Sequence, residues 1–217
     1  MISGHFFTLE GKESIPRAEG ARFIVFEGID GCGKSTAARL LYEHLKNQGH
    51  EVVLTKEPSL DSEAGRKIRR ILKGEIVVSV EERQQLFTDD RREHVARVIM
   101  PALKEGKIVI SDRYFFSTFA LGAATGVDLE WLIKINTEFI MPDLCVLVAV
   151  SPEVGLGRIR ARGEGMELHD RLDILQRAGD TYALLARRFE NFRKVDGEKP
   201  VEEVFEAVRS IYEKEMK

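Results

Sequence analysis

The sequence has 217 residues, of which 43% are hydrophobic and 32% are charged, and its formal net charge is −3. This length suits one α/β domain with a sizeable core, and the small negative charge argues against general attraction to nucleic acid or to anionic membranes. No apolar run approaches a membrane span, and the N-terminus lacks the features of a signal peptide. The two cysteines, Cys32 and Cys145, predict neither a zinc pair nor a disulfide framework, which favours a reducing cytoplasm.

The first third of the chain moves from an irregular start into alternating strands and helices. Residues 1–20 show no clear periodicity, and we expect an N-terminal extension that forms either a short hairpin or a disordered tail. An apolar run at 22–27 ends in glycines and predicts a buried strand. Helical spacing of apolar residues follows at 34–47. A second strand is predicted at 51–55, and a second helix at 62–74.

The rest of the chain continues this alternation. A long helix is predicted for 79–106, because Ser79 and Glu82 have capping-box spacing, with a bend near Pro101. The later predictions are strand 107–111, helices 114–124 and 128–140, strand 144–150, a helix from Ser151 to a polar break at 163–170, a helix to about Phe192, an edge strand at 193–195 and a helix at 200–216. Apolar strands that alternate with helices predict a parallel sheet covered on both faces, which is an α/β fold. Since there is no repeat or low-complexity linker, we predict one domain over 21–217.

The residues after the first strand match a phosphate-binding loop in full: Gly28, Ile29, Asp30, Gly31, Cys32, Gly33, Lys34, Ser35 and Thr36. Glycines allow backbone angles that turn N–H groups onto phosphate oxygens. Lys34 brings a positive charge to the β- and γ-phosphates, Ser35 offers a hydroxyl to Mg²⁺, and the helix N-terminus adds a favourable field. The alternative is a glycine turn that merely links a strand to a helix. The strand before and the helix after the motif favour the phosphate site.

Cys32 lies inside this loop, close to a helix N-terminus that could lower the pKa of its thiol. One interpretation is therefore a redox-sensitive cysteine, which bound nucleotide should protect from alkylation. The other interpretation is a small residue that fits the loop, and this is the one that we favour.

A P-loop alone does not distinguish kinases, GTPases and motor ATPases, although the chain has no N-K-x-D segment of a switch GTPase. Six segments occur in the order shown by thymidylate kinases: FIVFEGIDGCGKST (23–36), TKEP (55–58), LFTDDRREHV (86–95), PALKEGKIVISDRY (101–114), MPDLCVLVAVSPEV (141–154) and RIRARG (158–163). From about residue 22 onward the chain thus resembles the thymidylate kinase (dTMP kinase) family of P-loop nucleoside monophosphate kinases. The resemblance implies a three-layer sandwich with a central parallel sheet, ATP and Mg²⁺ as cofactors, dTMP as acceptor, and a homodimer.

Asp112 and Arg113 follow the third predicted strand, at the carboxyl edge of the sheet where ligands of open α/β folds bind. Phosphoryl transfer between two nucleotides requires two facing anion sites and positive charge around the transferred group. Asp112 can anchor Mg²⁺ through water, and Arg113 can bind the acceptor phosphate, with Lys34 on the donor side. The alternative for the pair is a surface ion pair at a strand end.

The acceptor side depends more on the resemblance. Phe87 and Arg91 share one helical face, and the family implies that Phe87 stacks on the acceptor base while Arg91 bonds a base carbonyl. Without the family, a core phenylalanine beside a solvated arginine would be preferred. Asp30 looks like the family aspartate that faces the acceptor sugar and phosphate. Glu57 and Pro58 look like the motif that shapes the acceptor wall.

Arg158, Arg160 and Arg162 precede the polar break and resemble the family's mobile lid, here around 158–171, with Arg158 and Arg162 as catalytic candidates. Such a lid closes arginine over the transferred phosphate and excludes water. The P-loop carries no arginine of its own, which makes charge from the lid the expected arrangement. A helix with a solvated, arginine-rich face is the alternative.

The match is weaker after Arg113, where the family usually has an aromatic residue or a glutamine that reads the thymine or excludes a ribose hydroxyl. Ser117 fits the pattern, whereas Leu121 and Gly122 do not, and Thr118 is the candidate for a replacement hydrogen bond. The strand at 144–150 also lacks the aspartate that often ends it. The acceptor's base and sugar are therefore left open.

Three functions follow, and the first is a kinase that phosphorylates dTMP to dTDP. The second is a related kinase for another nucleoside monophosphate or a nucleoside. The third, motivated by Leu121, is a nucleotide-binding regulatory protein without turnover, against which the retained Lys34, Ser35, Asp112 and Arg113 argue. In each case the expected partners are small nucleotides rather than nucleic acid or a membrane.

Overall fold

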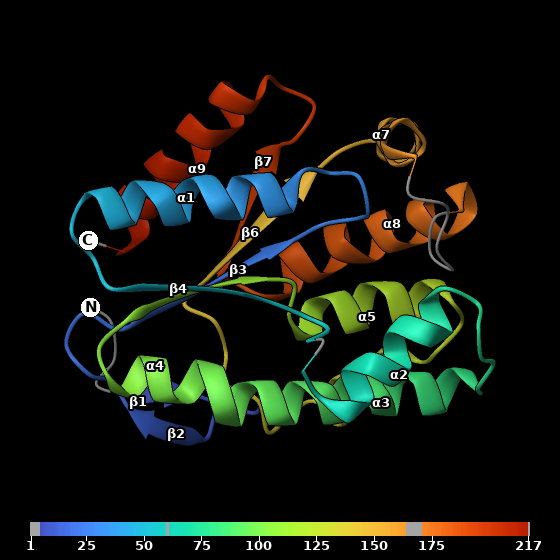
Figure 1. The fold of residues 1–217 in the computed structure, drawn as a ribbon, viewed down its shortest axis with the longest axis horizontal. Coiled ribbons are helices and arrows are strands. Elements are labelled where there is room, and N and C mark those ends of the chain that lie inside the picture. The colour runs from blue at the N-terminus through green and yellow to red at the C-terminus, as the bar shows by residue number, and fades with distance from the viewer. Residues whose placement is uncertain (1–4, 60, 164–170, 217) are drawn as a thin grey trace.

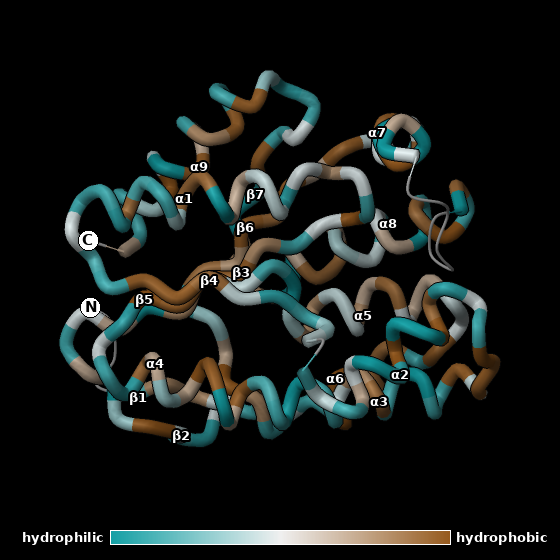
Figure 2. Tube along the Cα trace, in the orientation of Figure 1, coloured by the Kyte–Doolittle hydropathy of each residue, from teal (hydrophilic) through white to brown (hydrophobic). Residues whose placement is uncertain are grey.

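The computed structural model describes residues 5–59, 61–163 and 171–216. At its centre lies a parallel sheet in the order β4-β5-β3-β6-β7 (Figure 1). The strands are β3 (Arg22–Glu27), β4 (Val52–Lys56), β5 (Ile108–Asp112), β6 (Leu144–Ala149) and β7 (Phe192–Asp196). The inner strands β3, β5 and β6 are almost wholly buried, as continuous apolar sequences require when both faces are covered. Figure 2 shows the same concentration of hydrophobic residues along the central strands.

Helices cover both faces of this sheet. They are α1 (Lys34–Asn47), α2 (Glu63–Leu72), α3 (Val80–His94), α4 (Met100–Lys104), α5 (Phe115–Ala124), α6 (Leu129–Lys134), α7 (Pro152–Arg162), α8 (Leu172–Arg188) and α9 (Val201–Met216). In Figure 1, α1 and α9 lie on one face, and α3, α4, α5 and α8 lie on the other. The predicted three-layer α/β fold is thus confirmed. Among the described residues, none of the helices combines the length and apolar character that a membrane crossing requires.

Three helical predictions need correction. The long helix at 79–106 begins as expected, with the Ser79 side chain accepting from Glu82 N, but a π-helical turn at Val95–Ile99 (η1) joins α3 to α4. Pro101 cannot donate an N–H to the preceding turn, which accounts for the irregular segment there. The predicted helix 128–140 is too long, since α6 ends at Lys134. Asn136, just beyond that end, donates a hydrogen bond from its side-chain amide to Leu132 O, and its Oδ1 accepts one from Arg91. Helix α8 likewise ends before the predicted boundary at Phe192, which begins β7.

The hairpin alternative for the N-terminal extension is confirmed over residues 5–16. Strands β1 (His5–Phe7) and β2 (Glu13–Pro16) pair antiparallel, with Phe6 and Ile15 buried. The chain after β2 is held by Asp143, which accepts two hydrogen bonds from the Arg17 guanidinium at 2.6 and 2.9 Å and a third from Phe23 N at 2.8 Å. Arg17 also stacks on the Phe6 ring, 3.8 Å from its centroid. The hairpin is therefore anchored to the start of β3 and to the segment before β6.

Replacing Asp143 with alanine should reduce the free energy of unfolding by about 3 kcal/mol, because the nearly buried Arg17 loses its carboxylate partner. Urea denaturation of both proteins measures the difference. Glu43→Ala is the control, since the Arg39–Glu43 pair is exposed and should contribute only about 0.5 kcal/mol or less. Equal losses in the two variants would contradict this account.

Candidate active site

The phosphate-binding loop between β3 and α1 is held in shape by close backbone contacts at two of its glycines, where no side chain would fit. Gly28 and Gly31 both have positive φ angles, of 144° and 78°. A Cβ atom at Gly28 would lie 2.4 Å from the carbonyl oxygen of Val148, and one at Gly31 would lie 2.2 Å from that of Gly155. Glycine is therefore required at both positions, by conformation and by packing. The loop is fixed against the end of β6 and the first turns of α7.

Lys34 closes the loop from the first turn of α1. Its side chain is buried, and Nζ lies 3.4 Å from the carbonyl oxygen of Ile29 and 3.6 Å from Asp30 Oδ1. The N-terminus of a 14-residue helix begins at the same point. Backbone N–H groups, the helix dipole and a buried ammonium group together make an anion site. These features suit the phosphate site predicted for residues 28–36, and phosphate binding there stays a prediction.

Ser35 and Asp112 lie at the mouth of the loop and form a pair. Ser35 Oγ donates to Asp112 Oδ2 at 2.5 Å, while Asp112 Oδ1 is buried and has no hydrogen-bond partner among the described residues. Lys56 Nζ lies 3.6 Å from Oδ2. Hydroxyl and carboxylate oxygens suit Mg²⁺, which needs only one or two protein ligands when phosphates supply the rest. The residues present therefore fit the predicted magnesium site, although the described chain contains no cluster of three acidic, histidine or cysteine residues.

Among the described residues, Arg113 is the one non-glycine residue with a left-handed backbone, at φ 75°. This conformation is tolerated where surrounding contacts enforce it. Its buried guanidinium donates to Asp30 Oδ1 at 2.6 Å, to Ser117 Oγ at 2.8 Å and to Gly28 O at 3.3 Å. Burial alone would lower the pKa of Arg113, but Asp30 and other nearby acidic groups raise it above its ordinary value. The side chain is therefore a permanent, oriented positive charge between the loop and α5.

Glu27, the last residue of β3, fixes the elements around Arg113. Its carboxylate accepts from Ser117 Oγ at 2.5 Å, Tyr182 Oη at 2.8 Å, Tyr114 N at 2.9 Å and Ser117 N at 3.1 Å. Burial raises the pKa of Glu27, against the effect of these hydrogen bonds and of the Arg113 charge. Glu27 was not among the predicted site residues, although a lone acidic residue directly after the apolar segment 23–26 was a usable signal. Glu27 joins β3 to α5 and α8.

A cavity of about 210 Å³ opens beside Arg113. All the residues predicted for the acceptor line it: Asp30, Glu57, Pro58, Phe87, Arg91, Arg113, Ser117 and Thr118. Leu121 lies there as well. The sequence analysis did not select the other lining residues: Lys56, Arg69, Leu72, Gln84 and Tyr114. Lys56 and Arg69 add positive charge to the cavity, and their positions within the TKEP motif and on α2 were the available signals.

Arg91 is fixed by the protein itself. Its guanidinium is 1% exposed and donates to Glu57 Oε2 at 2.8 Å, Asn136 Oδ1 at 2.6 Å and Thr118 Oγ1 at 2.9 Å. The alternative of a solvated arginine beside a core phenylalanine is therefore wrong. Because Thr118 accepts from Arg91, its hydroxyl proton is left to be donated into the cavity. His94 Nδ1 lies 3.1 Å from the second Glu57 oxygen and completes the network.

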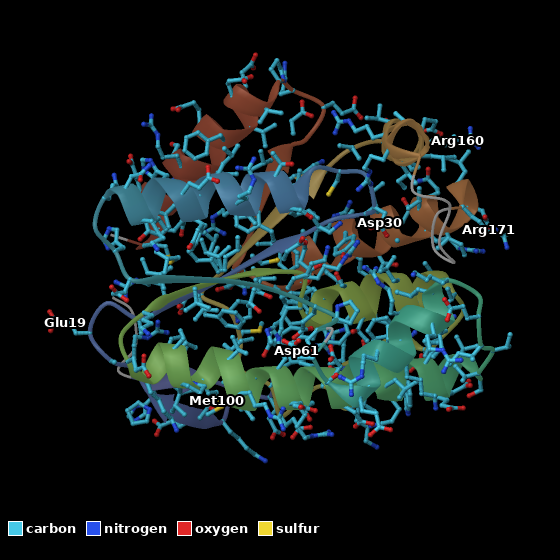
Figure 3. All side chains as sticks on the ribbon, in the orientation of Figure 1. Glu19, Asp30, Asp61, Met100, Arg160 and Arg171 are labelled. Atoms are coloured by element: carbon cyan, nitrogen blue, oxygen red, sulfur yellow. The ribbon has the colours of Figure 1, made fainter. Side chains whose placement is uncertain are left out.

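The three arginines of α7 differ in burial and in their contacts. Arg158 is half-buried and donates to the carbonyl oxygens of Gly197, at 2.9 Å, and Cys32, at 3.5 Å, so it contacts the backbone of the phosphate loop. Arg160 and Arg162 are exposed, and Figure 3 shows Arg160 at the edge of the molecule and Asp30 nearer its centre. Half of the predicted lid, at 164–170, lies outside the described residues. The role of these arginines over a phosphate stays a prediction.

Cys32 is packed inside the phosphate loop. It is 1% exposed, and its Sγ lies 2.8 Å from the position that a Cβ at Gly28 would take. Burial raises the pKa of the Cys32 thiol, despite the opposing charges of Lys34 and Arg113. This supports the interpretation of Cys32 as a small packing residue.

Iodoacetamide at pH 8 should therefore label Cys32 slowly, equally with and without ATP, because a raised pKa leaves little thiolate and burial limits access. Mass spectrometry of digested protein follows the modification. Cys145, also buried with its pKa raised by burial, is the internal comparison, and protein unfolded in guanidinium should label at both positions. Rapid labelling of native Cys32 that ATP suppresses would restore the redox interpretation.

Glu27→Ala should reduce the free energy of unfolding by about 3–5 kcal/mol, because the Ser117 and Tyr182 hydroxyls and two backbone N–H groups lose their acceptor. Urea denaturation measures the loss. Glu206→Ala, which removes an exposed pair with Arg209, should have little effect. A Glu27 variant as stable as this control would show that the hydrogen bonds of Glu27 do not stabilise the fold.

The amino-acid sequence was compared with a family model and with known proteins, and both comparisons point to the same family. A family model described as "Thymidylate kinase" matches residues 26–208. The chain is 42% identical over 199 residues to a probable thymidylate kinase of Pyrococcus horikoshii, covering 89% of this chain and 97% of that protein. A thymidylate kinase of Caldicellulosiruptor saccharolyticus is 36% identical over 196 residues, covering 88% and 95%. A probable thymidylate kinase of Archaeoglobus fulgidus is 39% identical over 191 residues, covering 88% and 94%. The chain therefore belongs to the thymidylate kinase family.

Proposed function

We propose that the protein transfers the γ-phosphate of ATP to dTMP, which gives ADP and dTDP. The observation that carries this proposal is the contact between Asp30, in the phosphate loop, and Arg113, on the wall of the acceptor cavity, at 2.6 Å. It brings an anion site and the cavity beside Arg113 to one point, as transfer between two nucleotides requires. Membership of the thymidylate kinase family supports dTMP as the acceptor.

On the donor side, the N–H groups of the loop and Lys34 bind the phosphates of ATP. Ser35 and Asp112 would hold Mg²⁺, which, when bound, neutralises charge on the phosphate oxygens. The free Oδ1 of Asp112 supports this assignment.

On the acceptor side, Arg113 binds the phosphate of dTMP, in competition with its present partner Asp30. Phe87 offers a ring to the base, and the Thr118 hydroxyl offers a proton to a base acceptor. An acceptor phosphate oxygen is already ionised at neutral pH, so transfer needs no strong general base and no covalent intermediate. Lys34 and Arg113 stabilise the charge that spreads over the transferred group.

Four wider assignments belong to the same proposal. The segment 158–171 acts as a lid that brings Arg158 and Arg162 toward the donor and excludes water. Residues 21–217 form one kinase domain, with 1–20 as an extension, and the protein assembles as a homodimer without nucleic acid. The two free thiols, Cys32 and Cys145, support a cytoplasmic location.

A coupled assay of ADP release across nucleoside monophosphates and nucleosides tests the reaction. We expect dTMP to be used well above dUMP, dCMP, dAMP, dGMP, the ribonucleotides and thymidine, and we expect chelation of divalent metal to abolish turnover. A different preferred acceptor would support a related kinase. No turnover with any acceptor, together with ATP binding, would support a regulatory nucleotide-binding protein.

Arg113→Ala should reduce kcat roughly 100- to 1000-fold, the usual effect of removing one group that stabilises a transition-state charge. The dissociation constant for ATP, measured by calorimetry, should stay near that of the wild type. Arg39→Ala, on an exposed face of α1, is the control and should change neither value. A comparable loss of ATP affinity in Arg113→Ala would assign this residue to the donor side instead.

A further inference from the structure

Gln84 is a buried amide on α3 that the proposed mechanism does not use. It is 1% exposed, and its Oε1 has no hydrogen-bond partner among the described residues. Gln84 lines the acceptor cavity together with Phe87 and Arg91, which lie three and seven residues further along the same helical face. Buried side-chain polar atoms almost always have a partner. An unpaired amide beside a ligand cavity therefore points to a ligand as the missing partner.

The facing helix α5 explains how the amide fits there. A Cβ atom at Gly122 would lie 3.2 Å from Gln84 Cδ and 2.8 Å from a terminal carbon of Leu132. Glycine at 122 thus leaves the space that the Gln84 side chain occupies. Leu121, the neighbouring residue on α5, lines the cavity without any hydrogen-bonding group. At this end of the cavity the polar group comes from α3 rather than from α5.

We propose that Gln84 is a specificity-determining residue that hydrogen-bonds the base of the acceptor nucleotide; this rests on the proposed function above. A primary amide presents one donor and one acceptor side by side, and in Gln84 the acceptor Oε1 is the atom that lacks a partner among the described residues, so the group it needs is an N–H of the ligand. That pair is complementary to the imide edge of thymine or uracil, where a carbonyl stands next to an N–H. Cytosine presents a different pattern of donors and acceptors. Gln84 therefore favours dTMP over dCMP.

The alternative is that Gln84 only fills space between α3 and α5. The two roles predict opposite effects on stability. An amide whose oxygen has no partner contributes little to folding, so an apolar side chain of the same length should leave the protein as stable or more stable. A packing role through hydrogen bonds would instead make the variant less stable.

Gln84→Met tests the proposal, because methionine keeps the length of the side chain and removes the amide. We expect the KM for dTMP to rise about 5- to 100-fold, the range for one hydrogen bond to a buried group. The KM for ATP and the kcat should stay within about twofold, since Gln84 lies away from the transferred phosphate on α3. The preference for dTMP over dCMP should shrink, and the Tm should be unchanged or higher.

Gln85→Met is the matched control, because Gln85 is the exposed neighbour whose amide donates to Asp89 at 3.1 Å, and it should leave every value unchanged. Wild-type KM and wild-type preference in Gln84→Met would overturn the role of Gln84 alone. A lower Tm with equal KM increases for dTMP and dCMP would also overturn it, in favour of a structural role. A wild-type enzyme that turns over no dTMP would overturn the proposed function, and the imide assignment with it.

Discussion

Arg113 is a positive charge that the fold buries at the point where β5 leaves the sheet, and the site is organised around that charge. A buried charge is tolerated only when partners compensate for its lost hydration. Those partners come from different parts of the chain, since Asp30 belongs to the phosphate loop and Ser117 to α5. Glu27 accepts a hydrogen bond from the Ser117 hydroxyl and so fixes its position. One electrostatic requirement therefore sets the relative positions of the loop, the sheet edge and the cavity wall.

The second buried ion pair acts in the same way on the far side of the cavity. Arg91 and Glu57 join α3 to the segment after β4, and Asn136 extends the network toward α6. Because both networks are largely satisfied from within the protein, a ligand meets groups that are already oriented, and little ordering remains for binding to impose. Among the described residues, three buried oxygens at the site have no partner: Asp112 Oδ1, at the proposed magnesium site, and Gln84 Oε1 and Tyr114 Oη, on residues that line the cavity.

Much of this architecture follows from local sequence. The apolar runs at β3, β5 and β6 define the sheet, and the glycines with Lys34 define the phosphate loop. The residues proposed for the acceptor, which line one cavity, were named in advance through the resemblance to a family. Spacing alone places Phe87 and Arg91 on one helical face without saying that Arg91 is buried. Its burial depends on Glu57 and Asn136, residues 34 and 45 positions away in the chain.

The same dependence on distant contacts explains what the sequence did not reveal. Gln84 lies in the polar stretch EERQQ, which resembles a solvated helical face, and its burial depends on the absence of a side chain at Gly122. Helix α6 is shorter than its apolar pattern suggests, since Asn136 is needed as an acceptor for Arg91. Glu27 offered a local signal, but its four donors come from Tyr114, from Ser117 of α5 and from Tyr182 of α8. In each case a tertiary contact decides the role of a residue whose neighbours give little indication of it.

The packing of Gly31 against Gly155 also limits how α7 can move. Their backbones approach so closely that not even a methyl group fits between them, and Asp30 O lies 2.8 Å from the position of a Cβ at Gly155. The first turns of α7 are thus packed tightly against the phosphate loop. Any movement of the proposed lid that keeps this contact must therefore begin beyond Gly155 in the chain.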